Sequence, residues 1–563
     1  MNRILLPSLT GGTKHPRYFS FLAWMTNRFH KQEKIHNLKN FKQYLRLYES
    51  LLVVSTLFHH REHDDLRGII GRRSFKKRNW GDITQVDLSD IRGASQTSSW
   101  EPANYQPATS ALKLVGYSSG SNPSLVRGLG ELVAEGFEAS LGTEVIASLD
   151  ALDSNGATVV SRDLIEAFSQ RGCICGQGMC SQERSALADS IVLAKDVDSL
   201  RPGLSEQSGT FGLILDVLSQ ARIPADSSWC EEAIFRGVSF SNQGLKPKGC
   251  FLESFHGWRI QLLRSLQRYA LECLWYSFHS HFKGTHFSPT KVAKFARQCS
   301  EKWVESLSKE EKECLKTVSS EVPKTLGDIF KRVQRTQARI LNGGDKLKRF
   351  PFAPETVNEL EVSELVSSAI DEGEWEAGVN LSVILLACVS VRMSLLVDGN
   401  HSIENEFVSL GGATHLGMKL VNRKLAERLD YQYSEYLQSH FEEWVVGQHL
   451  KTASRKIRTQ GTDTYRIRLE ESGYTCFGGV RMPPSHTVYS NMFDSAISNL
   501  KELSLVRVVP SESALSVEYL AETADTFELP EEIYEVTKLG IDYLNEISRN
   551  MDNLNASVAK DLV

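Results

Sequence analysis

Apolar side chains recur at helical spacing through most of the 563-residue chain, and this periodicity limits the possible folds more than any other feature. The clearest example lies between residues 257 and 282, where an apolar face opposes a polar one. The apolar face contains Leu262, Leu266, Tyr269, Ala270 and Cys273, and the polar face contains Arg264, Gln267, Arg268 and Glu272. Comparable patterns extend over residues 125–450, so the sequence predicts a mainly α protein, and its length predicts several domains.

Two further helices are predicted near the N-terminus, over residues 16–35 and 37–60, from the same spacing of apolar residues. Residues 380–397 form an apolar stretch that approaches the length of a membrane span. Arg392 and three serines interrupt this stretch. We therefore expect a buried core helix there and no contact with a membrane.

The period changes from helical to alternating after Gln460. Tyr465, Ile467 and Leu469 fall on one face of a predicted strand, and two arginines fall on the other. A turn at "EESG" and a return strand at "YTCF" would complete a hairpin. Downstream, residues 493–503 predict a helix, and residues 505–509 and 514–520 predict two short strands. A helix followed by a hairpin is the closing half of a winged-helix domain, although no helix is predicted directly before it.

Changes in composition predict five regions along the chain. The first is basic and helical, the second is an irregular connector rich in Ser, Gly, Asp and Pro, and two helical domains follow. The last is a small α+β, winged-helix-like module that ends in an acidic tail. In this order the regions are residues 1–80, 81–122, 123–342, 354–460 and 461–563.

The formal net charge of −5 conceals an asymmetry between the two ends. Residues 1–80 contain 16 Lys or Arg and five Asp or Glu, a balance of +11, whereas residues 511–563 contain 12 acidic and three basic side chains, a balance of −9. This asymmetry predicts a polyanionic partner, or contact of the two ends with each other or with a neighbouring subunit.

Cysteine usage and the first residues of the chain indicate the compartment. Ten cysteines without regular spacing are not typical of a secreted disulfide framework. The opening residues, "MNRILLPSLTGG", lack the apolar core of a signal peptide. We expect a cytoplasmic protein.

A basic cluster between residues 449 and 469 is the first candidate binding surface, with six basic side chains against a single Asp463. On a helix, Lys451, Arg455 and Arg458 share one stripe, and the following hairpin presents Arg466 and Arg468 on its polar face. If the intervening turn folds that face beside the helix, five cations converge on a surface that attracts phosphates. The alternative interpretation is a solvated helix exterior.

A second basic cluster follows the N-terminal helices. Its cations alternate with Phe75 and Trp80, as is typical of surfaces that combine phosphate contacts with base stacking. The alternative is a solvated loop whose tryptophan packs into the core. The cations of this cluster are Arg72, Arg73, Lys76, Lys77 and Arg78.

Three cysteines close together are a candidate zinc site. Cys173, Cys175 and Cys180 lie within eight residues, and the glycines between them would let the backbone wrap around an ion. A fourth ligand, Cys230 or a histidine, would have to come from elsewhere. The alternative is that these cysteines are buried and pack a loop against a helix.

Other arrangements of reactive side chains are weaker indications. His59 and His63 have the spacing of two zinc ligands on one helix face, but the glutamate of an HExxH motif is absent. Asp398, His401 and Glu404 would have to meet in a cleft. The chain contains no recognisable hydrolase, Walker or nuclease motif. We therefore assign no catalytic residue and expect a protein that is not an enzyme.

Two stretches resemble parts of large bacterial proteins encoded in phage-defence neighbourhoods. The N-terminal one comprises "GGTKHPRYFSFLAWM", "RLYESLLVVSTL" and "RGIIGRR", similar to an R-Y-[YF]-S-F…W helix, a second helix and a G-[IV]-[IV]-G element. The C-terminal one comprises "QHLKTASRKIRTQGTDTYRIRLEESG" and "AISNLKELSLV", similar to a Q-G-x-D-T-[FY]-R segment and a following helix end. Ser504 stands where that helix end usually has glycine. The resemblance implies a role in defence and no particular catalytic residue.

Charge and resemblance together predict a non-catalytic, nucleic-acid-engaging subunit of a multi-gene bacterial anti-phage system. It would contact DNA or RNA and work with other subunits, such as an ATP-driven helicase or nuclease. One alternative is a protein–protein scaffold whose basic N-terminal region binds an acidic surface. Another is a divergent metal-dependent hydrolase that uses the cysteines or histidines named above.

Overall fold

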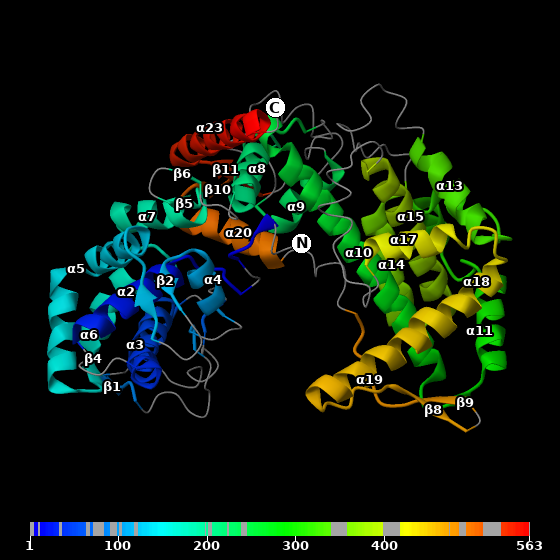
Figure 1. Cartoon of the computed structure of the whole chain (residues 1–563), viewed down its shortest axis with the longest axis horizontal. Coiled ribbons are helices and arrows are strands. Elements are labelled where there is room, and N and C mark those ends of the chain that lie inside the picture. The colour runs from blue at the N-terminus through cyan, green and yellow to red at the C-terminus, as the bar shows by residue number, and fades with distance from the viewer. Residues whose placement is uncertain are drawn as a thin grey trace.

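A computed structural model gives the structure of the protein, and the predicted mainly helical fold is confirmed. Two helical lobes are joined by a middle group of elements, and together they form an arch (Figure 1). The described residues are 5–9, 12–32, 37–62, 68–70, 84–89, 98–100, 104–117, 122–196, 199–200, 205–221, 225–237, 245–338, 357–397, 417–471, 473–483, 491–510 and 531–561.

The first lobe is built around helix α2, whose residues are almost all buried because α5 and α3 pack against it. Trp24 at its centre is fully buried. This part of the chain also forms three short antiparallel strand pairs, β1–β4, β2–β3 and β5–β6. The helices are α2 (Arg17–Gln32), α3 (Leu38–His59), α4 (Gln106–Ala111), α5 (Leu129–Asn155), α6 (Arg162–Gly172) and α7 (Ser181–Ile191). The strands are β1 (Gln85–Asp87), β2 (Val115–Gly116), β3 (Ser124–Leu125), β4 (Val159–Ser161), β5 (Lys195–Asp196) and β6 (Ser199–Leu200).

The middle group brings together residues that are far apart in the sequence. Helix α23 packs on α8, because an apolar stripe of Tyr543, Leu544, Ile547 and Met551 needs a partner. Strands β10 and β11 form an antiparallel pair next to these helices. The elements are α8 (Ser205–Ala221), α9 (Ser227–Arg236), η3 (Gly249–Phe251), α20 (Asn491–Glu502), β10 (Val506–Pro510), β11 (Glu532–Val536) and α23 (Lys538–Asp561).

The second lobe forms around helix α10, which contacts α8 and α9 as well as α14 and α15 and so connects the lobe to the middle group. A three-stranded sheet in the order β7–β9–β8 lies at its edge. The helices are α10 (Leu252–Phe282), α11 (Pro289–Glu301), α12 (Lys309–Cys314), η4 (Lys316–Ser319), α13 (Leu326–Ala338), α14 (Glu359–Asp371), α15 (Trp375–Val397), α17 (Met418–Ala426), α18 (Tyr433–His440), η6 (Phe441–Gly447) and α19 (Gln448–Gln460). The strands are β7 (His286–Phe287), β8 (Ile467–Glu470) and β9 (Gly473–Cys476).

Helix α15 is the predicted core helix. Among the described residues, it is the one helix long and apolar enough to cross a membrane, and 89% of its most apolar stretch is buried. It packs against α10, α14, α13 and α11. Arg392, which interrupts the stretch, is buried and bonds Glu359 on α14, with its Nε 2.7 Å from the Glu359 Oε1.

The C-terminal module expected over residues 461–563 is divided between two places. The β8–β9 hairpin belongs to the second lobe, because β9 pairs with β7, which follows α10. Helix α20 and β10 belong to the middle group, and the partner of β10 is β11. The strand expected at residues 514–520 lies outside the described residues, and α23 follows β11. The winged-helix arrangement is therefore not established.

Candidate nucleic-acid interface

Helix α19 continues a single helical run through α18 and the π-helical segment η6. Its side chains are polar on nearly every face, and Ala453 is the only residue of α19 that is fully buried. The helix ends at Gly461, whose φ of 65° lies in the left-handed region that glycine adopts without strain. Because α19 contributes so little to the core, most of its surface is open to a partner.

The hairpin is held beside the helix by His449, near the start of α19. The Nε2 of His449 accepts hydrogen bonds from the backbone N–H groups of Arg466, at 2.9 Å, and Ile467, at 3.3 Å. The hydroxyls of Ser454 and Tyr465 are 2.6 Å apart and form a second link. The ring of Trp275 on α10 stacks on His449 with centroids 4.7 Å apart. The expected approach of helix and hairpin is therefore present.

The electrostatics of His449 indicate that cations from both elements lie around one ring. The pKa of His449 is lowered to about 4, mainly by burial and in addition by His279, Arg466 and Lys456. Arg466 comes from the hairpin and Lys456 from the helix. At neutral pH the imidazole is therefore uncharged, as its role as a double acceptor requires.

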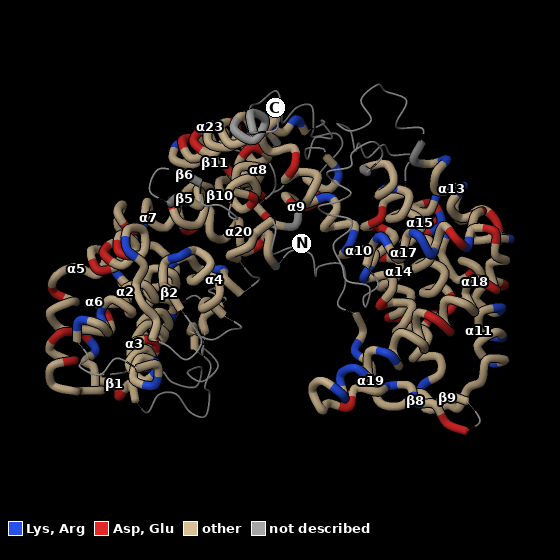
Figure 2. The backbone as a smooth tube through the Cα atoms, in the orientation of Figure 1, with Lys and Arg blue, Asp and Glu red and all other residues tan. Residues whose placement is uncertain are grey.

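Six exposed cations on these two elements form what we call the basic surface, visible as blue segments around α19 in Figure 2. Asp463 lies 3.1 Å from Arg468 and is the one acidic partner that the described residues give to any of the six. Arg468 also lies over the ring of Phe477, 4.5 Å from its centroid. The members of the basic surface are Lys451, Arg455, Lys456, Arg458, Arg466 and Arg468.

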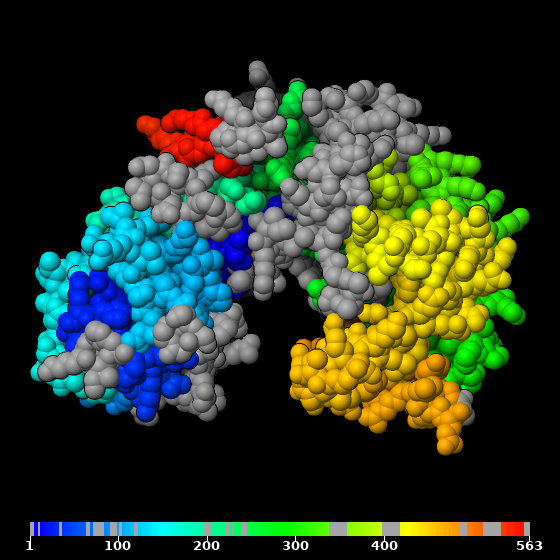
Figure 3. Space-filling model, viewed as in Figure 1, coloured from blue at the N-terminus to red at the C-terminus, as the bar shows by residue number. Residues whose placement is uncertain are grey.

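The basic surface lies at the edge of a broad hollow between the two lobes. Figure 3 shows the hollow, and α19 forms part of the rim that the second lobe contributes (Figures 1 and 3). Two large apolar side chains on the same two elements are also exposed, Ile457 at 40% and Leu469 at 68%. Of the residues in β8, only Ile467 is buried, and Leu469, which alternation puts on the same face, is exposed.

The other expected phosphate-binding and cleft residues cannot be placed in the same way. Arg72, Arg73, Lys76, Lys77 and Arg78 lie outside the described residues. So do Phe75, Trp80, His63, Asp398, His401 and Glu404.

Several cations of the basic N-terminal region pair with the protein's own carboxylates. Arg28 is 2.9 Å from Asp150 and 2.7 Å from Asp153 on α5, and Lys14 forms an ion pair with Asp494 on α20. Part of the positive balance of residues 1–80 is therefore neutralised within the chain.

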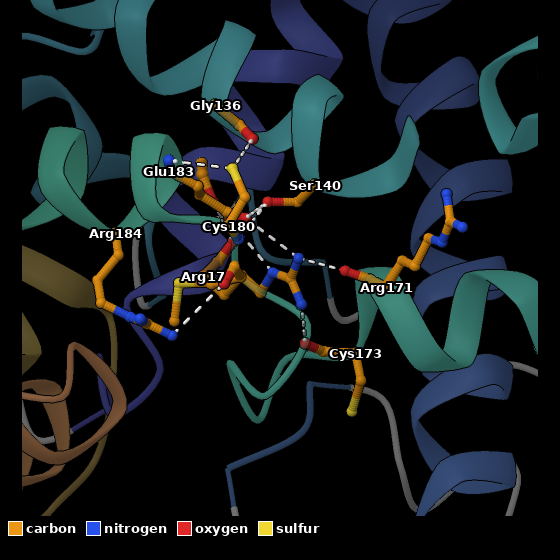
Figure 4. A network of polar contacts seen from close by, with 10 residues as sticks. Arg17, Gly136, Ser140, Arg171, Cys173, Cys180, Glu183 and Arg184 are labelled. Atoms are coloured by element: carbon orange, nitrogen blue, oxygen red, sulfur yellow. Dashed lines mark hydrogen bonds and ion pairs between the residues drawn. The ribbon is translucent and has the colours of Figure 1, made fainter. Parts of the chain in front are cut away.

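Arg17 and Glu183 form a fully buried ion pair that sequence reasoning missed (Figure 4). Two N–H groups of Arg17 donate to the Glu183 carboxylate, at 3.1 and 3.2 Å, and others donate to the carbonyls of Arg171 and Cys173. The hydroxyls of Ser20 and Ser140 also donate to Glu183, at 2.6 and 2.5 Å. This network fixes the loop after α6 against α2 and α5.

The three candidate zinc ligands separate into two places. Cys180 caps the N-terminus of α7, where its Sγ accepts from the Glu183 N–H at 3.4 Å and lies 3.6 Å from the Gly136 carbonyl (Figure 4). Cys173 and Cys175 instead lie beside His59 and His60, with the four ligand atoms within 4.8 Å of one another. The two histidines of this group, His59 and His60, come from the end of α3.

The two cysteines of this cluster have opposite ionisation tendencies. A hydrogen bond from the Cys173 thiol lowers the pKa of Cys175, and His60 also lowers it. The same hydrogen bond, together with burial, raises the pKa of Cys173. Cys230, the other proposed ligand, is buried in α9, in the middle group.

Comparisons with models of protein families, with curated proteins and with solved structures found no match to this chain. The interpretation of function therefore depends on the chain's own geometry and on the resemblance of its motifs.

Proposed function

We propose that the basic surface binds the sugar–phosphate backbone of DNA or RNA, and that the protein is a non-catalytic nucleic-acid-engaging subunit of a multi-gene bacterial anti-phage system. The observation that carries the proposal is the meeting of exposed cations from α19 and β8 with a single acidic partner, Asp463. Surface charges of a folded protein are usually of mixed sign, so an uncompensated group on two elements favours a polyanionic ligand.

The shape of the surface supports backbone contacts more than reading of bases. Lys451, Arg455 and Arg458 lie on one stripe of α19, and Arg466 extends the charge onto the hairpin. Long flexible cations on a convex helix suit phosphates along a strand, which carry no sequence information. Binding that depends little on sequence and strongly on salt is expected.

The place in a defence system rests on the motifs "RYFSFLAW" and "QGTDTYR" and on their resemblance to proteins from phage-defence neighbourhoods. A subunit that holds nucleic acid through its backbone needs another protein to act on it. We therefore expect a partner of the helicase or nuclease type that uses ATP.

The test is a charge reversal with a matched control. Arg455→Glu, Arg458→Glu and Arg466→Glu in one chain should weaken binding to a short labelled DNA duplex, a DNA single strand or an RNA by at least about 100-fold at low salt, because phosphate contacts supply most of the affinity. The control chain carries Lys294→Glu, Arg297→Glu and Lys309→Glu, which change net charge equally at exposed positions of α11 and α12.

The control separates a local effect from the effect of net charge. If the surface binds the ligand, the control chain should retain most of its affinity. Unchanged binding in the first variant, or an equal loss in both variants, would contradict the assignment.

A further inference from the structure

We propose that His59, His60, Cys173 and Cys175 form a zinc site that ties the end of α3 to the loop after α6. This site is separate from the basic surface, which lies on the other lobe (Figure 1). His59 is the last residue of α3 and His60 is its C-cap, while Cys173 is the C-cap of α6. The side chains thus come from two chain segments more than 100 residues apart.

The donor set is the one that zinc prefers. Two thiolates and two imidazoles bind Zn²⁺ tetrahedrally, at about 2.3 Å for sulfur and about 2.0–2.1 Å for nitrogen. Such bonds place neighbouring ligand atoms roughly 3.3–3.8 Å apart. The four atoms already lie within 4.8 Å of one another, so closure around an ion needs movements of about 1 Å or less. Calcium and magnesium prefer oxygen ligands, which this cluster does not offer.

Contacts that involve none of the four ligand atoms hold the cysteine loop in place. Arg17 Nη1 donates to the Cys173 carbonyl at 2.7 Å, from within the buried Arg17–Glu183 pair. The N–H of Ile174 lies 3.5 Å from the Thr56 hydroxyl on α3. The loop therefore lies against the helix that carries both histidines, which keeps both thiols beside the imidazoles.

Glycines explain how the loop turns so tightly around the cluster. Gly176 has a φ of 79°, a conformation that other residues rarely adopt. A Cβ at Gly178 would lie 2.4 Å from the Gln170 carbonyl oxygen, so a larger residue has no room there. Between them, Gln177 places its Oε1 3.1 Å from the Nε2 of His59. Hydrogen-bond acceptors of this kind orient the histidines that bind metals.

Four protein ligands leave no open coordination position, so the site would stabilise structure rather than catalyse a reaction. A zinc ion there would fix α3 relative to α6 and α7. It would also account for two half-buried histidines and two cysteines in one small space.

The full-length chain, purified in reductant and then given Zn²⁺ or Co²⁺, tests the inference. Metal analysis should find roughly one zinc per chain, and the cobalt form should show sulfur-to-cobalt charge transfer and the intense visible bands of a tetrahedral site. Chelation of the zinc should lower the midpoint of thermal unfolding.

Two variants and one control make the test specific. Cys175→Ser and His59→Gln should each lose most of the bound metal and the cobalt spectrum, while Cys180→Ser should keep both, since Cys180 caps α7. His59 lies at a half-exposed helix end, so His59→Gln remains informative if Cys175→Ser fails to fold. A wild-type chain that binds no stoichiometric zinc with reduced thiols, ligand variants that bind as well as wild type, or a chain isolated with a Cys173–Cys175 disulfide would each overturn the proposal.

Discussion

Ser504 occupies a position that favours glycine. After α20 ends at Glu502, Ser504 has a φ of 60°, and its N–H bonds the Lys501 carbonyl while the Leu505 N–H bonds the Leu500 carbonyl. These two bonds define a Schellman motif, in which the left-handed residue is usually glycine. A glycine at this point would adopt the left-handed conformation without a side-chain penalty.

Ser504→Gly should therefore stabilise the protein by about 1 kcal/mol, because it removes the cost of a left-handed side chain. The reverse change at another helix end is the matched comparison. Gly461→Ala, where no atom lies within 4 Å of the added Cβ, should destabilise by a similar amount through the backbone alone. Urea denaturation of both variants measures this, and a loss of stability in Ser504→Gly would contradict it.

Glu183 should be among the residues least tolerant of truncation. Glu183→Ala leaves the fully buried Arg17 without its carboxylate and two serine hydroxyls without their acceptor. A loss of about 3–5 kcal/mol is expected, because a buried charge is left unpaired. Glu166→Ala, at an exposed position of α6, should change the free energy of unfolding by less than about 0.5 kcal/mol. Equal effects of the two changes would argue against a structural role for the ion pair.

Sequence patterns reveal residues such as Ser504 because the motif is local, but they do not reveal partners that are distant in the chain. Arg17 and Glu183 are 166 residues apart, and no periodicity connects them. The group of His59, His60, Cys173 and Cys175 shows both cases. The cysteine pair was visible, but His59 was grouped with His63 by helical spacing, whereas the structure groups it with His60 at the helix end.

At the scale of elements, the helices were predictable because an amphipathic helix displays its buried face within a few turns. The long apolar stretch of α15 and the hairpin at residues 464–476 follow from local patterns too. What those elements pack against does not follow. Strand β9 pairs with β7, which lies almost 190 residues earlier, and α23 covers α8. These long-range partners explain why the expected C-terminal module is divided.

The link between α19 and the hairpin should weaken in acid. His449 must be neutral to accept two N–H groups, and burial lowers its pKa in the folded protein to about 4 from an ordinary value near 6.5. Between these two values the unfolded chain binds a proton that the folded chain does not, so stability falls as the pH falls from about 6.5 towards 4.

His449→Gln offers an acceptor that does not titrate. The quantity to compare is the free energy of unfolding of wild type minus that of the variant. This difference should be greater at pH 7.5 than at pH 5 by about 1 kcal/mol, a value reduced to allow for the partial exposure of the ring. Burial also lowers the pKa values of His256 and His440, to about 4 and about 3. Both residues titrate in wild type and in the variant, so their contributions to the pH dependence of stability cancel in the difference. A difference that does not change with pH would show that His449 has no such role.

At the scale of the whole molecule, the structure places the basic N-terminal region and the acidic C-terminal stretch in different surroundings. Several N-terminal cations pair with carboxylates of α5 and α20, and the acidic C-terminal stretch ends in a helix that packs on α8. Removal of α23 would therefore expose the apolar face of α8. The uncompensated positive charge is instead on α19 and on Arg466, directly before β8, at the edge of the hollow (Figures 2 and 3).

The dependence of nucleic-acid affinity on salt tests the central claim most directly. If Lys451, Arg455, Lys456, Arg458 and Arg466 each neutralise a phosphate, the logarithm of the association constant for duplex DNA should fall against the logarithm of salt concentration with a slope of about −4 to −5. The chain with Arg455→Glu, Arg458→Glu and Arg466→Glu should give a slope of about −2 or shallower. A shallow slope in the wild type, or the same steep slope in both chains, would contradict the account.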